Sequence, residues 1–150
     1  MSEENVEVVR RWLSFPARNL PANLEEVPAF VAEFCDVDVD YYPVRKFSEA
    51  QPSHGLEELS KFLTHWLDAW SYLEWAVREL IEVGDDRVLA RVNLRTEGAG
   101  SGVKLEGDIY QCAWLRHGRL FRIEDHLTVS GALHALGLEG RTLEDAGLRE

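Results

Sequence analysis

Three carboxylates and two tyrosines stand close together in the stretch CDVDVDYYP, in the first third of the chain. Asp36, Asp38 and Asp40 occupy every second position, and Tyr41 and Tyr42 follow directly before a proline. A carboxylate buried in an apolar pocket acquires a raised pKa and can act as a general acid or base. Any strand with one solvated face produces the same spacing of two. The stretch therefore predicts a strand whose register decides whether it carries chemistry.

Two registers of this strand are open. Plain alternation directs Val37, Val39 and Tyr41 to the core and leaves the aspartates in water. A shift by one residue, or a bulge, directs Asp40 and Tyr42 into the protein instead. In that second register Asp40 is a candidate base, and Tyr42 is a candidate hydrogen-bond donor to a ligand.

A second pair of acids, Glu124 and Asp125, lies in the segment RIEDHL. Because neighbouring residues of a strand point to opposite faces, one of the two must face the concave side of a curved sheet. Burial there among apolar side chains raises the pKa of a carboxyl group, which makes Asp125 a second candidate acid or base. The alternative is a structural hydrogen bond or an ion pair with a helix arginine.

His54 stands just before Gly55 at the start of a predicted helix, where it either transfers protons near neutral pH or is an ordinary surface residue. The histidines and acids form no recognised metal-ligand spacing, so we expect no metal. The chain has no G-x-S-x-G motif and no glycine-rich phosphate loop between a strand and a helix. We therefore expect no cofactor.

Length and charge limit the possible functions. A chain of 150 residues predicts a single domain over 1–150, with its core at about 5–136 and a polar tail at 139–150. Sixteen basic against 27 acidic residues give a net charge of −11, which argues against nucleic-acid and membrane partners. We expect two free thiols at Cys35 and Cys112, no signal peptide and no membrane span, and therefore a cytoplasmic location.

The periodicity of the apolar residues predicts an α+β protein. Helical spacing indicates helices over about 2–15, 28–34 and 56–70, while alternation indicates strands over about 35–43, 72–83, 88–95, 104–116 and 119–127. Pro28 suits the first turn of the second helix, and Gly137 ends a short helix, GALHAL, after the last strand. The predicted order is ααβαββββ plus this short C-terminal helix. Three N-terminal helices are expected to pack on one face of a curved antiparallel sheet.

Four segments carry a resemblance to a known family. They are NVEVVRRWLSF in the first helix, DVDVDYYP in the first strand, HGLEELSKFLTHWLDAW in the third helix and WLRHGRLFRIEDHL across the last hairpin. With these segments the chain resembles a SnoaL-like (polyketide cyclase-like) member of the nuclear transport factor two-like superfamily. The resemblance implies a cone-shaped fold and a cavity between the helices and the concave face of the sheet. It does not imply one reaction, because this fold carries both enzymes and binding proteins.

An overlay on ketosteroid isomerase, a member of the same superfamily, tests whether its machinery is retained. The isomerase uses an oxyanion tyrosine, a protonated aspartate and an aspartate base. The corresponding positions here are Trp12, Gln111 and Tyr42, so none of the three groups is retained. Trp12 and Gln111 can still donate hydrogen bonds to a ligand oxygen, whereas Tyr42 is a poor base at neutral pH.

The overlay also implies which side chains face the cavity and which face outward. The inward set on the later strands is Val88, Ala90, Val92, Leu94, Ile109, Gln111, Ala113, Ile123, Asp125 and Leu127. The outward set is Arg91, Asn93, Arg95, Asp108, Tyr110, Trp114, Arg122, Glu124 and His126. The resemblance implies that this outer face forms a homodimer contact.

Two functions follow as hypotheses. The first is an enzyme that acts without a cofactor on a small apolar organic molecule, as an isomerase, cyclase, dehydratase or hydrolase. Its expected catalytic groups are Asp125 or Asp40, with Tyr42 and Gln111, and its expected ligand contacts are Trp12, His54, Phe62, Trp66, Val92, Ile109 and Ile123. The second is a non-catalytic binding protein or structural dimer of the same fold. A weaker third possibility, a trio of the epoxide-hydrolase type, requires Arg91 or Arg95 inside the cone.

Overall fold

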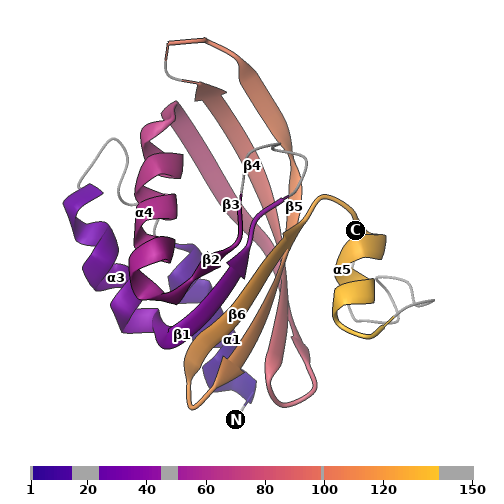
Figure 1. Ribbon diagram of the computed structural model, residues 1–150. Helices are drawn as coiled ribbons and strands as arrows, with labels where there is room; N and C mark the ends of the chain where they lie inside the picture. Colours follow the sequence, from indigo (N-terminus) through magenta and orange to yellow (C-terminus); the bar gives the residue numbers. More distant parts are fainter. Residues whose placement is uncertain (1, 15–23, 45–50, 99, 139–150) are drawn as a thin grey trace.

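The fold is a layer of helices that covers the concave face of one curved sheet (Figure 1). The computed structural model describes residues 2–14, 24–44, 51–98 and 100–138. The helical layer consists of α1 (Ser2–Leu13), the single 3-10 turn η1 (Leu24–Glu26), α3 (Val27–Phe34) and α4 (Gly55–Asp68). Of these, α1, α3 and α4 are the three predicted helices, and the predicted polar tail at 139–150 lies outside the described residues.

Local sequence signals explain where these helices begin and end. The first turn of α1 carries Glu3 and Glu4, and its last turn carries Arg10 and Arg11, which matches the sign of the helix dipole at each end. A proline occupies the first turn of α3, as predicted, where it displaces no helical hydrogen bond. At the start of α4, Gly55 has a φ of +87°, which a residue with a side chain rarely adopts.

Six strands form the sheet, in the order β2-β1-β6-β5-β4-β3. Their bounds are β1 (Cys35–Tyr42), β2 (Ser53–His54), β3 (Trp70–Val83), β4 (Arg87–Gly98), β5 (Lys104–Arg116) and β6 (Arg119–His126). The long strands from β3 to β6 form an antiparallel meander, as predicted. The pairing of β1 with β6 is parallel, so the sheet is mixed rather than wholly antiparallel. Parallel pairing requires a long connection, and here α4 and the meander provide it.

A register shift in β1 resolves the ambiguity of the CDVDVDYYP stretch. The backbone N–H of Asp38 donates to the side chain of Asp36 at 2.9 Å, within a shift between Cys35 and Asp40. Val37 consequently points to solvent and is 70% exposed. Beyond the shift the strand alternates regularly, with Val39 and Tyr41 buried. Of the three residues that plain alternation directs inward, two are inward and Val37 is outward.

The sheet separates two apolar cores. The larger core lies between the helices and the concave face and includes Val9, Val31, Leu59, Val92 and Ile123, all of them inaccessible to solvent. The smaller core lies on the opposite face, where α5 (Val129–Ala135) packs against β5 and β6. Its members are Val83, Leu89, Cys112, Ala132, Leu133 and Leu136. Cys35 and Cys112 are buried free thiols, as predicted.

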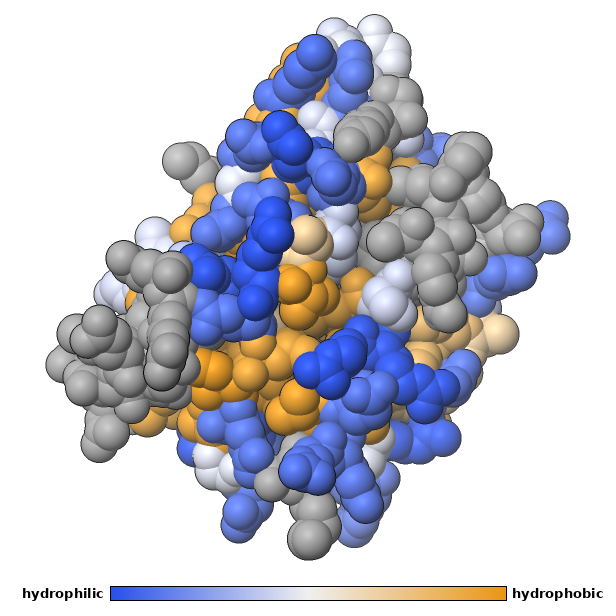
Figure 2. Space-filling view, turned by 180° about the vertical axis from the view of Figure 1, so that it is seen from behind, coloured by the Kyte–Doolittle hydropathy of each residue, from blue (hydrophilic) through white to orange (hydrophobic). Residues whose placement is uncertain are grey.

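The edge strand β3 is only partly covered by the helical layer. Its apolar side chains Leu73, Trp75, Val77 and Leu80 pack against the larger core but are half-buried. Figure 2 shows the side of the molecule that lies behind in Figure 1, where apolar side chains gather in the middle and hydrophilic ones surround them. In the described part of the chain, no helix is long and apolar enough to cross a membrane.

Candidate functional site

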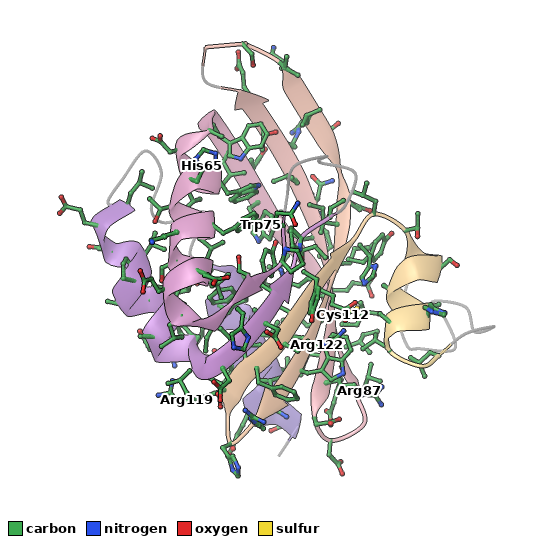
Figure 3. The ribbon with its side chains drawn as sticks, viewed as in Figure 1. His65, Trp75, Arg87, Cys112, Arg119 and Arg122 are labelled. Carbon is green, nitrogen blue, oxygen red and sulfur yellow. The ribbon has the colours of Figure 1, made fainter. Side chains whose placement is uncertain are left out.

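A cavity of about 290 Å³ lies between the helical layer and the concave face of the sheet. Its wall is almost entirely apolar and aromatic. The lining residues are Trp12, Leu13, Phe30, Tyr41, Pro43, Val44, Phe62, Leu63, Trp66, Leu67, Trp70, Trp75, Leu94, Leu105, Ile109, Gln111 and Asp125. Figure 3 shows Trp75 on the α4 side of the sheet and Cys112 on the α5 side. A concave apolar site with a few polar groups is the usual form of a small-molecule pocket.

Four polar groups in the cavity wall form one chain of hydrogen bonds. The indole N–H of Trp12 donates to the Oε1 atom of Gln111 at 3.1 Å. The Nε2 atom of Gln111 donates to the Oδ1 atom of Asp125 at 2.8 Å. The other carboxyl oxygen of Asp125, Oδ2, is hydrogen-bonded to the hydroxyl of Tyr41. These hydrogen bonds link α1, β5, β6 and β1. The residues that they join lie up to 99 positions apart in the sequence.

Burial controls the electrostatics of this chain. Loss of water raises the pKa of Asp125 above its ordinary value of 3.8, against the opposing effect of the hydrogen bonds from Tyr41 and Gln111. Burial and the adjacent Asp125 carboxylate together raise the pKa of Tyr41 well above its ordinary value. Asp125 therefore combines a position in the cavity wall with a readier uptake of a proton, the two properties that acid or base catalysis needs.

Aromatic rings form most of the remaining wall. Trp12 stacks on Phe30 with ring centroids 5.4 Å apart, and Tyr41 packs against Phe62 at 5.1 Å. Trp66 meets Trp70 and Trp75 edge-on, at 6.2 and 5.7 Å. Among the described residues, the indole nitrogens of Trp70 and Trp75 have no hydrogen-bond partner, although both are buried. Unpaired buried donors of this kind are uncommon, and two of them border this cavity.

The structure brings together most of the side chains selected from the sequence. Asp125, Gln111, Trp12, Phe62, Trp66 and Ile109 all line the cavity. Val92 and Ile123 are fully buried in the core on the same side of the sheet, but they do not line the cavity. The roles proposed for these residues stay predictions, since position alone does not establish catalysis.

Asp40, Tyr42 and His54 lie outside the cavity, and the expectation that they line it is wrong. Asp40 is on the surface, where its carboxylate lies 2.5 Å from the Nδ1 atom of His54, and their side chains are 39% and 67% exposed. The hydrogen bond and the negative charge of Asp40 raise the pKa of His54. Tyr42 lies on the outer face, 4.7 Å from the Arg122 guanidinium. The physical reason is the register of β1, in which Tyr41 takes the inward position.

Tyr41 is the site residue that the sequence analysis did not select. Plain alternation already directed it inward, but the overlay favoured its neighbour Tyr42. The inward parity of Asp125 together with an inward Tyr41 was the signal that could have identified this pair. No arginine enters the cone from β4, because Arg91 pairs with Glu79 at 2.8 Å and Arg95 with Glu74 at 3.5 Å on the outer face. The trio of the epoxide-hydrolase type is therefore not formed.

Comparisons with known proteins place the chain by its fold. A scan against protein-family models finds no match, and a search of the curated proteins finds no similar sequence. A protein from Jannaschia sp. CCS1, assigned by similarity as a SnoaL-like polyketide cyclase, superposes with a TM-score of 0.67 at 16% identity, over 91% of this chain and 93% of that one. TerC, co-crystallised with polyporic acid, gives 0.65 at 22% identity, over 89% and 97% of the two chains.

A protein of unknown function from Burkholderia pseudomallei K96243, described as similar to nuclear transport factor two, gives a TM-score of 0.66 at 21% identity, over 91% and 98% of the two chains. The chain therefore has the α+β fold of the nuclear transport factor two-like superfamily. This confirms the fold implied by the sequence resemblance. In the described part of the chain, no group of three or more potential metal ligands comes together.

Proposed function

We propose that this protein binds a small, largely apolar and aromatic molecule in the concave cavity, and that Asp125 exchanges a proton with that molecule without a cofactor. The observation that carries the proposal is the position of the Asp125 carboxyl group in an otherwise apolar wall, held by Tyr41 and Gln111. Its raised pKa supports use as an acid or a base. Isomerisation, cyclisation and dehydration all begin with such a transfer.

The size and chemistry of the wall support a compact aromatic ligand. A volume of about 290 Å³ is near the lower end of the roughly 300–1,000 Å³ of ligand pockets. Rings packed edge-on and stacked in the wall offer favourable contacts to a further ring. The unpaired indole N–H groups of Trp70 and Trp75 are additional donors near such a ligand. Similarity to a SnoaL-like polyketide cyclase and to TerC, which was crystallised with polyporic acid, supports the same class.

Deuterium exchange tests the proton transfer without knowledge of the natural substrate. A panel of small aromatic ketones, such as α-tetralone, is incubated with the protein in D2O, and loss of the proton next to the carbonyl group is followed by NMR. We expect exchange above the buffer rate for at least one ketone. Asp125→Asn should abolish this excess, whereas Asp40→Asn, a matched change of an acid outside the cavity, should retain it. Unchanged exchange in Asp125→Asn would remove Asp125 from the mechanism.

A second function, ligand binding without chemistry, is favoured by one observation. Both carboxyl oxygens of Asp125 already take part in hydrogen bonds, to Gln111 and to Tyr41. With both oxygens satisfied, the Asp125 carboxyl group would have a structural role: it would hold the cavity wall in shape without exchanging a proton. If the ketones bind but show no excess exchange with the unmodified protein, this second function replaces the first.

We also propose that the protein forms a homodimer through the outer face of the sheet. This face supports pairing of two copies because positive and negative side chains lie side by side on it, such as Arg91 beside Glu79 and Asp108. It also carries the partly exposed Arg122, whose guanidinium group stacks on the rings of Tyr42 and Trp114. Light scattering during size-exclusion chromatography should give twice the mass of 17.1 kDa. Arg122→Glu should shift the protein toward the monomer; a monomeric unmodified protein would refute the proposal.

A further inference from the structure

The hydrogen-bond chain in the cavity has a fixed direction, which begins at Trp12. An indole N–H can only donate, so the group of Gln111 that faces it must be the acceptor oxygen, as the 3.1 Å contact to Oε1 has it. The NH2 group of Gln111 then faces Asp125, at 2.8 Å from Oδ1. Both side chains are buried, with Gln111 only 4% exposed, so water does not compete for these positions. Trp12 thus sets the orientation of the Gln111 amide.

The orientation of the amide determines where Asp125 can carry a proton. Because the NH2 group is only a donor, Oδ1 of Asp125 must stay an acceptor. When the carboxyl group is neutral, its proton therefore sits on Oδ2, the oxygen that is hydrogen-bonded to the Tyr41 hydroxyl. The Tyr41 oxygen then accepts a hydrogen bond from the carboxyl O–H, and the O–H of Tyr41 is free to donate to a ligand. When the carboxyl group is ionised, Tyr41 donates to Oδ2 and keeps only a lone pair for other partners.

We propose that Tyr41 is the group that hydrogen-bonds the ligand, and that Trp12 and Gln111 are positioning residues that make Asp125 select the ligand class. With Asp125 neutral, the cavity presents the Tyr41 O–H and binds an aromatic ketone through its carbonyl oxygen. With Asp125 ionised, the cavity presents a lone pair of Tyr41 and binds a phenol through its O–H. This inference rests on ligand binding in the cavity, as in the proposed function, but not on catalysis.

The ionisable groups that act on Asp125 come from the sheet and not from the helices. Tyr41 on β1 and His126 on β6 act on the carboxyl group, and the charge of Asp125 acts in turn on Cys112 of β5. The helices α1 and α4 contribute no ionisable group to the cavity wall, only Trp12, Leu13, Phe62, Leu63, Trp66 and Leu67. Tyr41 itself does not ionise in the relevant range, because its pKa lies well above the ordinary value of 10.0.

Three probes of similar size and different polarity test the inference. Naphthalene carries no polar group, α-tetralone carries a carbonyl acceptor, and 1-naphthol carries a hydroxyl donor. Their affinities are measured by calorimetry between pH 4 and pH 8. We expect naphthalene binding to be independent of pH, ketone affinity to fall up to tenfold per pH unit above the pKa of Asp125, and naphthol affinity to rise through the same range. Ketone and naphthol curves without opposite slopes would overturn the inference.

Asp125→Asn provides the sharpest variant, because it imitates the neutral acid permanently. The NH2 group of Gln111 requires an acceptor, so it pairs with the amide oxygen of the new side chain. The NH2 group of the new side chain then donates to the Tyr41 oxygen and leaves the tyrosine O–H free for a ligand. We expect this variant to bind the ketone as tightly as the unmodified protein does at low pH, with no dependence on pH, and to bind naphthol at least tenfold more weakly. Equal affinity for the two probes in this variant would contradict the assigned direction.

Two further variants test Tyr41 and Trp12 separately. Tyr41→Phe should lose at least tenfold in ketone affinity at low pH and retain naphthalene binding. Trp12→Phe frees the Gln111 amide to turn its oxygen toward Asp125, so a neutral Asp125 can carry its proton on Oδ1 while Oδ2 still accepts from the Tyr41 hydroxyl. Ketone affinity at low pH should therefore fall, and naphthol affinity should lose its dependence on pH; ketone and naphthol curves like those of the unmodified protein would exclude a positioning role. Failure of naphthalene to bind would overturn the proposed function as well, whereas failure of deuterium exchange leaves this inference standing.

Discussion

Asp125 and Asp40 lie on the same sheet, and each is hydrogen-bonded to one ring-bearing side chain. Asp125 bonds to Tyr41 in the cavity wall, among mostly apolar and aromatic side chains. Asp40 bonds to His54 on the surface, where both side chains are substantially exposed. Burial therefore favours the protonated form of Asp125, whereas Asp40 and His54 form an ion pair that solvent screens.

The difference shows that spacing along the strand does not select the functional acid. The CDVDVDYYP stretch contains three aspartates, yet its contribution to the cavity is Tyr41, the phenol next to them. The acid of the cavity comes from β6, 84 residues later in the chain. What distinguishes Asp125 from the aspartates of β1 is the face of the sheet on which it lies. Substitutions that compare the two faces should therefore give unequal effects.

The largest difference is expected between Asp125→Ala and Asp40→Ala. Removal of the Asp125 carboxyl group leaves both the Tyr41 hydroxyl and the Gln111 amide without a buried partner, at about 1–3 kcal/mol each. We expect the free energy of unfolding to fall by about 3 kcal/mol in total. Asp40→Ala should give a much smaller change because water replaces its partner. Urea unfolding followed by tryptophan fluorescence measures both, and losses of equal size would contradict the contrast.

A smaller difference is expected between the neighbouring tyrosines. Tyr41→Phe removes the donor of Asp125 and should lower the free energy of unfolding by about 2 kcal/mol, the usual effect of one unsatisfied buried polar group. Tyr42→Phe should change it by less than about 0.5 kcal/mol. The phenylalanine ring keeps the contact with Arg122 at 4.7 Å. Thermal unfolding at pH 7 compares the two variants, and a reversed order would place Tyr42 rather than Tyr41 in the interior.

The smallest effects are expected in the dependence of stability on pH. The pKa of Asp125 is raised in the folded state, so the unfolded chain releases the proton first, and stability falls as the pH rises from about 3.8 through the folded pKa. Asp125→Asn should remove this fall. The pKa of His54 is raised as well, so its contribution is complete below about 6.5 and is lost as the pH rises through the folded pKa.

Thermal unfolding from pH 3 to pH 9 separates these two contributions. The difference between the unmodified protein and Asp125→Asn should change only between about 3.8 and the folded pKa of Asp125, and the difference from His54→Ala only above about 6.5. The His54 contribution should also fade in 1 M salt, because its pair is exposed and screened. A salt-sensitive Asp125 contribution would indicate that this carboxyl group is accessible to solvent.

The fold was predictable from the sequence because its elements carry strong periodic signals. The amphipathic faces of α1 and α4 and the alternation along β3 to β6 determine both the elements and their order. The parallel pairing of β1 with β6 was not predictable from these patterns, since alternation specifies the faces of a strand but not its neighbour. The packing of α5 on the outer face depends on contacts between distant residues and carries no comparable local signal.

The site was predictable only as far as the strand registers were known. Asp125 and Gln111 lie on regular strands, and their parity places them in the cavity. The register of β1 depends on a side chain, Asp36, that captures the backbone N–H of Asp38. Hydrogen bonds of this local kind compete with strand pairing, and alternation does not reveal them. This hydrogen bond explains why Val37 lies outward. The expectation for Asp40 and Tyr42 came instead from the overlay on the isomerase, whereas plain alternation directs Tyr41 inward.

The second core, between α5 and the outer face of the sheet, has a practical consequence for protein engineering. Its members, such as Leu89, Cys112 and Leu133, are separated from the cavity by the thickness of the sheet. Changes at sites without shared contacts usually combine additively. Redesign of this smaller core, for example at Leu133, can therefore raise thermal tolerance while the ligand preference of the cavity is varied independently. Substitutions in the smaller core would thus alter stability, and substitutions in the cavity wall would alter ligand binding.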